Sequence, residues 1–340
     1  MRALLLSFLI AATVGVTSDA QRSPTLGDAD RIRIAEAFRL ADTLGDRLWS
    51  GWSSAPFALL LVTPDREFLI RHPKPTSDFV RVGDDAILGS PVWSRPRQFD
   101  VGLLASFPAV GEVPTIVIGQ PENTAAKTST RWVLTLVHEH FHQLQYSQPD
   151  YYPGVNRLGL ARGDQQGSWM LNYPFPYGTP EVQAPFARMC ALLDEAIRQE
   201  PGVRTMSALR AYLEAKRVLR GLVSPADYRY FNFQLWQEGI ARYTEYRIGE
   251  LAATGGTASP AFAALPDVAS YAGVSKAILD RIHTQLTTVV LGEAERSAFY
   301  PVGAAEGILL DRVNPGWRRQ YAGAGFTLDR LLGERSLTDK

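Results

Sequence analysis

The chain has 340 residues, of which 35 are lysine or arginine and 35 are aspartate or glutamate, so its formal net charge at pH 7 is zero. This balance argues against nucleic acid as a partner, because proteins that bind phosphate backbones carry an excess of basic residues. Cys190 is the only cysteine and lies in an apolar pattern, so we expect a buried thiol and a fold stabilised by its core without an internal disulfide.

Residues 1–20 have the features of a signal peptide. Arg2 gives a short positive start, residues 3–16 are apolar, and Ser18 and Ala20 are small residues at the positions that a signal peptidase recognises. We therefore expect cleavage after Ala20 and a secreted or periplasmic protein without a membrane span. An uncleaved membrane anchor is the alternative, but the apolar run is shorter than the roughly 20 residues that cross a bilayer.

The rest of the chain divides into a part with strand patterns and a part with helix patterns. Residues 21–127 contain one helical pattern and four apolar segments typical of strands, two of them spaced as a hairpin. Residues 128–340 show helical spacing almost throughout. Strands followed by helices predict an α+β fold, with a mainly antiparallel β-sheet subdomain followed by a helical subdomain. The expected helices are 29–50, 128–146, 181–199, 203–220, 226–253, 273–290, 302–313 and 327–333, and the expected strands are 57–62, 67–70, 101–107 and 115–118.

One long segment, residues 147–180, fits neither pattern. It is rich in glycine, proline and asparagine, and it also contains several tyrosines and other aromatic residues. So many aromatic residues argue against disorder. We interpret the segment either as the wall or lid of a cleft, or as a packed structural loop.

The expected helix 128–146 contains the sequence H-E-x-x-H as His138, Glu139 and His142. Residues four apart lie on one face of a helix, so the two imidazoles can bind one zinc ion while Glu139 acts as a general base. His140 is rotated by about 200° from His138 and is expected to be structural. The alternative is a surface helix with solvated side chains, which the apolar residues on both sides of the motif argue against.

A catalytic zinc ion needs a third protein ligand. The best candidate is Glu238, which lies in an apolar helical pattern beside Gly239 and Ala241, two small residues that allow another helix to approach closely. His72 and His283 are alternatives, although neither has an acidic or aromatic setting that indicates a site. A solvated surface glutamate at position 238 is the remaining alternative.

These residues resemble the gluzincins, the group of zinc peptidases that includes thermolysin and the zinc aminopeptidases. The aminopeptidase pattern E-G-x-x-x-Y-x-E is matched by Glu238, Gly239, Tyr243 and Glu245. The resemblance implies a zincin-like helical subdomain, one Zn²⁺ bound by the two histidines and Glu238, and a Glu245 that orients a ligand histidine. It covers only short segments, and the spacing between the two ligand helices is longer here.

The resemblance also implies a role for Tyr300. The zinc aminopeptidases have the sequence Y-x-K-G after their second ligand helix. At the corresponding place this chain has Tyr300 and Gly303, with Val302 in place of the lysine. In the family the tyrosine stabilises the oxyanion. A packing tyrosine at a helix start is the alternative. The family's G-x-M-E-N substrate motif is absent.

Together these features predict an exported zinc peptidase that acts on a peptide or protein substrate. Glu139 would transfer a proton from water to the leaving amine, and Tyr300 would donate a hydrogen bond to the oxyanion. We expect strand 115–118 to be the sheet edge with which a peptide pairs. Two other functions remain open: a non-catalytic zinc-binding protein, and a zinc hydrolase that acts on a non-peptide amide or ester.

Overall fold

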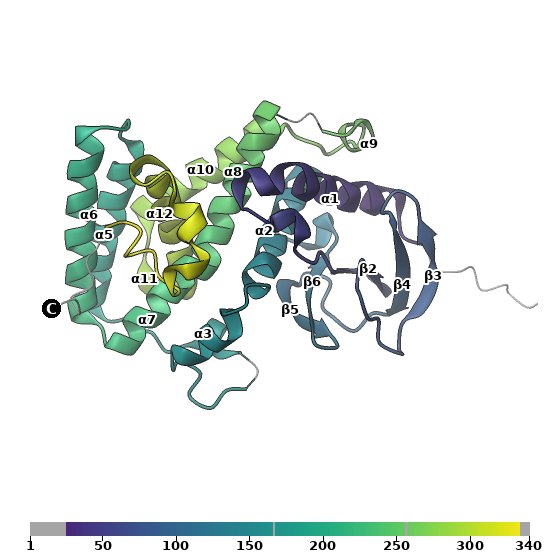
Figure 1. Ribbon diagram of the computed structural model, residues 1–340, viewed down its shortest axis with the longest axis horizontal. Coiled ribbons are helices and arrows are strands. Elements are labelled where there is room, and N and C mark those ends of the chain that lie inside the picture. The colour runs from purple at the N-terminus through teal and green to yellow at the C-terminus, as the bar shows by residue number, and fades with distance from the viewer. Residues whose placement is uncertain (1–24, 166, 256–257, 334–340) are drawn as a thin grey trace, which may run out of the picture.

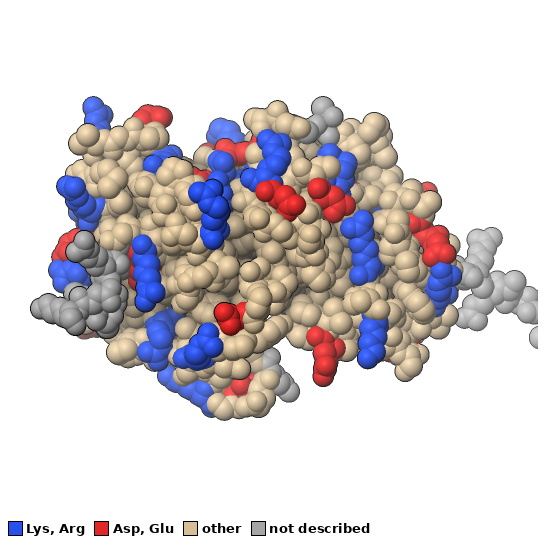
Figure 2. All heavy atoms as spheres, viewed as in Figure 1, with Lys and Arg blue, Asp and Glu red and all other residues tan. Residues whose placement is uncertain are grey.

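The computed structural model describes residues 25–165, 167–255 and 258–333 (Figure 1). The predicted signal peptide lies outside these residues. Within the described ranges, no helix combines the length and the apolar character needed to cross a bilayer. Acidic and basic side chains are interspersed over the face seen in Figure 2, in keeping with the zero net charge.

A six-stranded sheet forms most of the N-terminal part, in the strand order β3-β4-β2-β1-β6-β5. Every neighbouring pair is antiparallel except β1 and β6, which are parallel. The α+β fold with a mainly antiparallel sheet is therefore confirmed. The strands are β1 (Leu59–Val62), β2 (Arg66–Ile70), β3 (Val80–Asp85), β4 (Ser90–Pro96), β5 (Leu104–Val110) and β6 (Val113–Gly119).

Strands β3 and β4 were not predicted from the sequence. β3 is an edge strand with no buried residue, and its charged side chains mask the alternation that marks a half-buried strand. β4 contains Pro91 and Pro96, which argue against a strand in a sequence pattern. Both strands form because β4 pairs along the full length of β2.

The two faces of the sheet have different coverings. One face packs against α1 (Asp28–Leu48) and α2 (Ser129–Tyr146) and belongs to a hydrophobic core that continues into the helical part. The other face has a small separate core of Leu60, Val62, Leu69, Phe79, Val110 and Val117. Because the sheet and the helical part share the larger core, α2 lies in the middle of the molecule (Figure 1).

Helices fill the C-terminal part and gather at the end opposite the sheet (Figure 1). The expected long helices are present with small shifts at their ends. Residues 147–180 contain two short helices, α3 (Tyr151–Arg157) and α4 (Trp169–Asn172), where an irregular segment was expected. The other helices are α5 (Pro180–Arg198), α6 (Val203–Leu222), α7 (Pro225–Gln234), α8 (Ile240–Gly255), α9 (Pro260–Ala263), α10 (Tyr271–Thr288), α11 (Leu291–Ala294) and α12 (Phe299–Val313).

Two expected helices are corrected by the structure. The predicted helix 226–253 is interrupted by one π-helical turn, Leu235–Gly239, between α7 and α8. The predicted helix 327–333 is a series of turns. Its apolar residues Leu328, Leu331 and Leu332 are buried as the helical spacing suggested, but the segment is too short to form a helix against the core.

The π turn crosses α12 at two glycines. A Cβ atom on Gly303 would lie 2.7 Å from the Cα atom of Gly239, and a Cβ atom on Gly239 would overlap the backbone of Gly303. The close helix approach expected at Gly239 is therefore confirmed. This crossing brings Glu238 next to the first turn of α12, where Tyr300 lies one turn before Gly303.

Candidate metal centre

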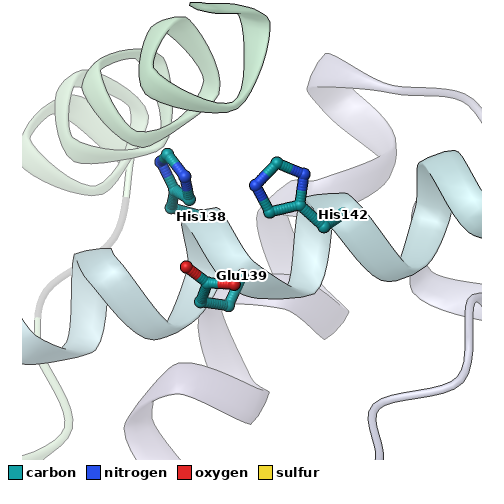
Figure 3. Close-up of side chains that lie close together, drawn as sticks. All are labelled: His138, Glu139 and His142. Atoms are coloured by element: carbon teal, nitrogen blue, oxygen red, sulfur yellow. The ribbon is translucent and has the colours of Figure 1, made fainter. Parts of the chain in front are cut away.

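The two histidines of the H-E-x-x-H sequence extend from the same side of α2, with the Glu139 carboxylate next to them (Figure 3). Their ring centroids are 5.1 Å apart. His138, Glu139 and His142 each offer a ligand atom, and these atoms lie within 4.8 Å of one another. The rest of α2 is packed into the core, so the helix holds these side chains in a fixed position.

Glu238 reaches this pair from the π turn. Its Oε2 atom lies 3.6 Å from His142 Nε2 and 4.0 Å from His138 Nε2. In a tetrahedral zinc site with bonds of about 2.0–2.1 Å, neighbouring ligand atoms are about 3.4 Å apart. Two imidazole nitrogens and one carboxylate oxygen thus form a donor set that could hold a metal ion, and the two distances from Glu238 are close to this spacing.

Gln145 fixes the orientation of His142. Its side-chain oxygen lies 2.7 Å from His142 Nδ1 and can only accept a hydrogen bond, so it favours a proton on Nδ1 and, when His142 is neutral, a lone pair on Nε2. The amide nitrogen of Gln145 donates to the main-chain oxygen of Gln237 at 3.0 Å. Gln145 therefore joins one candidate ligand to the π turn that carries another.

Glu245 takes the corresponding place beside His138. Its Oε2 atom lies 3.7 Å from His138 Nδ1, which is beyond hydrogen-bond length, and its Oε1 atom forms an ion pair with Arg131 Nη1 at 2.8 Å. Burial alone would raise the pKa of Glu245, but Arg131 and His138 outweigh it and lower the pKa to about 2. The structure thus brings Glu245 to the histidine, where the family resemblance places it.

His142 and Glu238 are electrostatically coupled. Burial would lower the pKa of His142, but the Glu238 carboxylate outweighs it and raises the pKa to about 9. Burial would raise the pKa of Glu238, but His142 and His138 lower it to about 2. In the metal-free protein a proton on His142 therefore pairs with Glu238, and the stability that His142 contributes in this way is lost as the pH rises through about 9.

Glu139 contacts the sheet through Ser106 of the edge strand β5. The Ser106 hydroxyl donates a hydrogen bond of 2.8 Å to Glu139 Oε2. The Glu139 side chain is buried, and its carboxylate has one hydrogen bond to the protein among the described residues. It can therefore still accept a proton from a water molecule in the site.

Tyr300 lies on the Glu238 side of the cluster. Arg296 Nη1 donates a hydrogen bond to its hydroxyl oxygen. Burial, followed by the nearby Glu238 carboxylate, raises the pKa of Tyr300 well above its usual value. The hydroxyl therefore keeps its proton at neutral pH and can donate a hydrogen bond.

The remaining histidines lie elsewhere. His72 Nε2 is 3.2 Å from the main-chain oxygen of Val110, and His283 Nδ1 is 2.5 Å from Asp194 Oδ1. His140 is stacked on Phe57 with a centroid distance of 3.8 Å, and burial lowers its pKa to about 3. Neither His72 nor His283 joins the cluster, which leaves Glu238 as the candidate for the third ligand.

The prediction that strand 115–118 is the sheet edge is wrong. β6 contains residues 115–118 and lies between β1 and β5, so its main-chain groups are already paired on both sides. β5 is the outer strand at this end of the sheet, and it carries Ser106 beside Glu139. The edge strand next to the cluster is therefore β5, and the main-chain oxygen of its Ser106 accepts a hydrogen bond of 3.0 Å from the Tyr146 hydroxyl.

The beginning of the segment 147–180 packs against the site. The ring of Tyr146 is stacked below His142 at a centroid distance of 6.2 Å, and the Tyr151 hydroxyl donates to Gln237 Oε1 at 3.0 Å. Tyr146 and Tyr152 also line a cavity of about 480 Å³ next to the β5–β6 turn. The start of the segment therefore packs beside Tyr146, the last residue of α2, and contacts the π turn through Tyr151.

Sequence analysis missed two residues that shape the site, Ser106 and Gln145. Ser106 carries no local signal, because its partner is 33 positions away in the chain. Gln145 was detectable in principle, since it lies three residues after His142 and is a polar side chain within an apolar helix pattern.

Comparison of the chain with known protein families, with curated proteins and with solved structures finds no match.

Proposed function

We propose that this protein is an exported zinc-dependent peptidase with one Zn²⁺ bound by His138, His142 and Glu238. The observation that carries the proposal is the position of Glu238 Oε2 within 4.0 Å of both Nε2 atoms, with the Glu139 carboxylate beside them. Three protein ligands leave a coordination position open, as catalytic zinc sites require, whereas structural zinc sites are usually closed by four protein ligands.

In this proposal each residue of the site has a distinct role. A zinc ion held by His138, His142 and Glu238 would supply Lewis-acid chemistry, polarising a carbonyl and lowering the pKa of a water molecule. Glu139 accepts a proton from the attacking water and passes it to the leaving amine, and the hydrogen bond from Ser106 holds its carboxylate in place. Tyr300 donates a hydrogen bond to the oxyanion. Gln145 and Glu245 orient the two imidazoles.

The position of β5 as the outer strand beside Glu139 supports a peptide as the substrate. An extended peptide that adds to this edge would displace the Tyr146 hydroxyl from the main-chain oxygen of Ser106, where it donates a hydrogen bond of 3.0 Å, and would bring a peptide carbonyl past Ser106 and Glu139. A small ester or amide would make no use of the strand edge.

Hydrolysis of a mixed peptide library, with and without a chelator, tests this proposal. The zinc-loaded protein should cleave peptides, lose the activity after chelation, and regain it when Zn²⁺ is added back. Full activity after complete removal of the metal would contradict the proposal. Zinc binding without any turnover would favour a binding protein, and turnover of only non-peptide amides or esters would favour a different hydrolase.

Replacing Tyr300 with phenylalanine tests its role as oxyanion donor. Because such a donor acts mainly in the transition state, kcat should fall by roughly ten- to a thousandfold while KM and zinc content change little. Tyr271→Phe is a matched control, since the Tyr271 hydroxyl donates to Glu36 and not to the cluster. If Tyr300→Phe lowers only the melting temperature and leaves kcat unchanged, Tyr300 is a packing residue.

A further inference from the structure

Two arginines flank Tyr300 on the helical side of the metal site. Arg242 belongs to α8, and its guanidinium carbon lies 5.5 Å from the centre of the Tyr300 ring. Arg296 precedes α12, and its guanidinium carbon lies 5.7 Å from the same ring. Both side chains are partly buried. Tyr300 itself is held next to Glu238 by the crossing of Gly239 and Gly303.

The hydrogen-bond partners of these two arginines are neutral. Arg242 Nη1 donates to Gln285 Oε1 at 2.8 Å, and Arg296 Nη1 donates to the Tyr300 hydroxyl. Arg131, in contrast, has its own ion pair with Glu245. Within the described part of the chain, neither Arg242 nor Arg296 has a carboxylate oxygen within 4.0 Å of a guanidinium nitrogen, although most other partly buried arginines around the core do.

A partly buried cation without a paired carboxylate is costly unless an anion arrives from outside. Burial would lower the pKa of Arg296, but Tyr300 and the more distant Glu238 carboxylate raise it, so the uncompensated position is that of Arg242. Burial lowers the pKa of Arg242, and the nearby cations Arg281 and Arg131 lower it further, while Glu245 acts in the opposite direction. The surroundings of Arg242 therefore favour the approach of a negative group.

The charges around the metal site lead to the same conclusion. The three carboxylates of Glu139, Glu238 and Glu245 lie among the guanidinium groups of Arg131, Arg242 and Arg296, with Arg281 close to Arg242, so they do not exceed the cations, and the histidines are neutral when they bind a metal. A bound Zn²⁺ then adds two positive charges. Each of the three carboxylates already has a role with a histidine, a metal or the attacking water, so none is left for the ammonium group of a peptide N-terminus.

We propose that Arg242 and Arg296 bind a carboxylate of the peptide on the helical side of the scissile bond. This inference rests on the proposed function and specifies its substrate class as peptides with a negative charge close to the cleaved bond. The planar guanidinium groups suit a carboxylate, because each can donate two parallel hydrogen bonds to its oxygens. The carboxylate belongs either to the C-terminus of the peptide or to an aspartate or glutamate side chain.

Binding of small peptides tests the inference without turnover. The probes are N-acetyl-Ala-Ala as the free acid, the same dipeptide as its amide, and N-acetyl-Ala-Asp amide. They are titrated calorimetrically into the zinc-loaded Glu139→Gln variant. The free acid should bind at least about tenfold more tightly than the amide, the usual size of a charge-assisted hydrogen bond. Tight binding of the Asp peptide would identify the side chain as the source, and weak binding of that peptide would identify the C-terminus.

Substitution of the arginines should remove this preference. In Arg242→Gln and Arg296→Gln the acid and the amide should bind with affinities within about threefold of each other, and in the corresponding lysine variants part of the preference should remain. Arg210→Gln is the charge-matched control, because Arg210 is exposed on α6 at the far end of the helical part (Figure 1). Zinc content and melting temperature show whether each variant folds. If a glutamine variant does not fold, the acid and amide affinities of the lysine variant at the same position test the inference instead.

The outcomes separate this inference from the proposed function. Equal binding of the acid and the amide by the parent, or a preference that survives both glutamine substitutions, would overturn the carboxylate site. Cleavage of amidated and free peptides at equal rates would also overturn the carboxylate site, but it would agree with the peptidase proposal. A clear preference for the acid in a protein that cleaves no peptide would instead support the carboxylate site and contradict the peptidase.

Discussion

Glu139→Gln should abolish most peptide hydrolysis and leave the zinc content unchanged. A glutamine has nearly the shape of the glutamate but cannot accept the proton of the attacking water, so turnover should fall by at least about a hundredfold. The hydroxyl of Ser106 can still donate to the side-chain oxygen of the glutamine, which keeps the local packing intact. The measurements are kcat on a cleaved peptide, zinc per protein by elemental analysis, and the melting temperature.

A matched control shows whether the charge or its position matters. Glu214→Gln removes the same charge from an exposed site on α6, where Glu214 pairs only with Arg217, and it should leave kcat unchanged. If Glu139→Gln hydrolyses peptides at the parental rate, Glu139 is not the general base. If instead the variant loses its zinc, Glu139 contributes to metal binding, which its closeness to both histidines permits.

Glu238→Ala should cost the protein its zinc. The substitution removes the only carboxylate that lies within 4.0 Å of both Nε2 atoms among the residues that the structure describes. We expect zinc affinity to fall by more than about a hundredfold, beyond the effect of losing a residue that merely orients a ligand. The measurement is zinc retained after dialysis against a competing chelator of known affinity.

Glu250→Ala is the control for this change, because Glu250 lies on α8, directly after the π turn, but contacts Tyr246 and Arg247. It should retain full zinc occupancy. Full occupancy in Glu238→Ala would contradict the proposed ligand set and leave Glu139 as the carboxylate ligand. The removal of Glu238 should also lower the pKa of His142 from about 9, since its carboxylate is the main cause of the increase.

The parts of the fold that were predictable from sequence are those with local causes. The hairpin of β1 and β2 and the helix α2 follow from apolar periodicity, and the spacing of His138 and His142 follows from the helical repeat. Glu238 was identified from its neighbours, because small residues within an apolar helix indicate a close approach. All of this information is contained in short stretches of sequence.

The parts that were missed depend on contacts between distant segments. β6 is an inner strand because β5 pairs with its outer side. Nothing in the sequence of residues 115–118 indicates this pairing. The π turn has no sequence signal of its own, since Leu235–Gly239 reads as a continuous helix. The roles of Ser106 and Arg296 likewise follow from partners on other elements.

The π turn also contacts a distant part of the chain, and this contact bears on the stability of the folded protein. Gln237 follows His142 by 95 residues, and the described contacts between them cross from the sheet side of the molecule to the helical side. An ion held by α2 and the π turn would close this long loop as a cross-link does. In the chain-entropy model, closing a loop of this length stabilises the folded state by about 4–5 kcal/mol. A protein with a single buried cysteine has no internal disulfide for this purpose, so a metal ion bound by α2 and the π turn would supply the cross-link between these two segments.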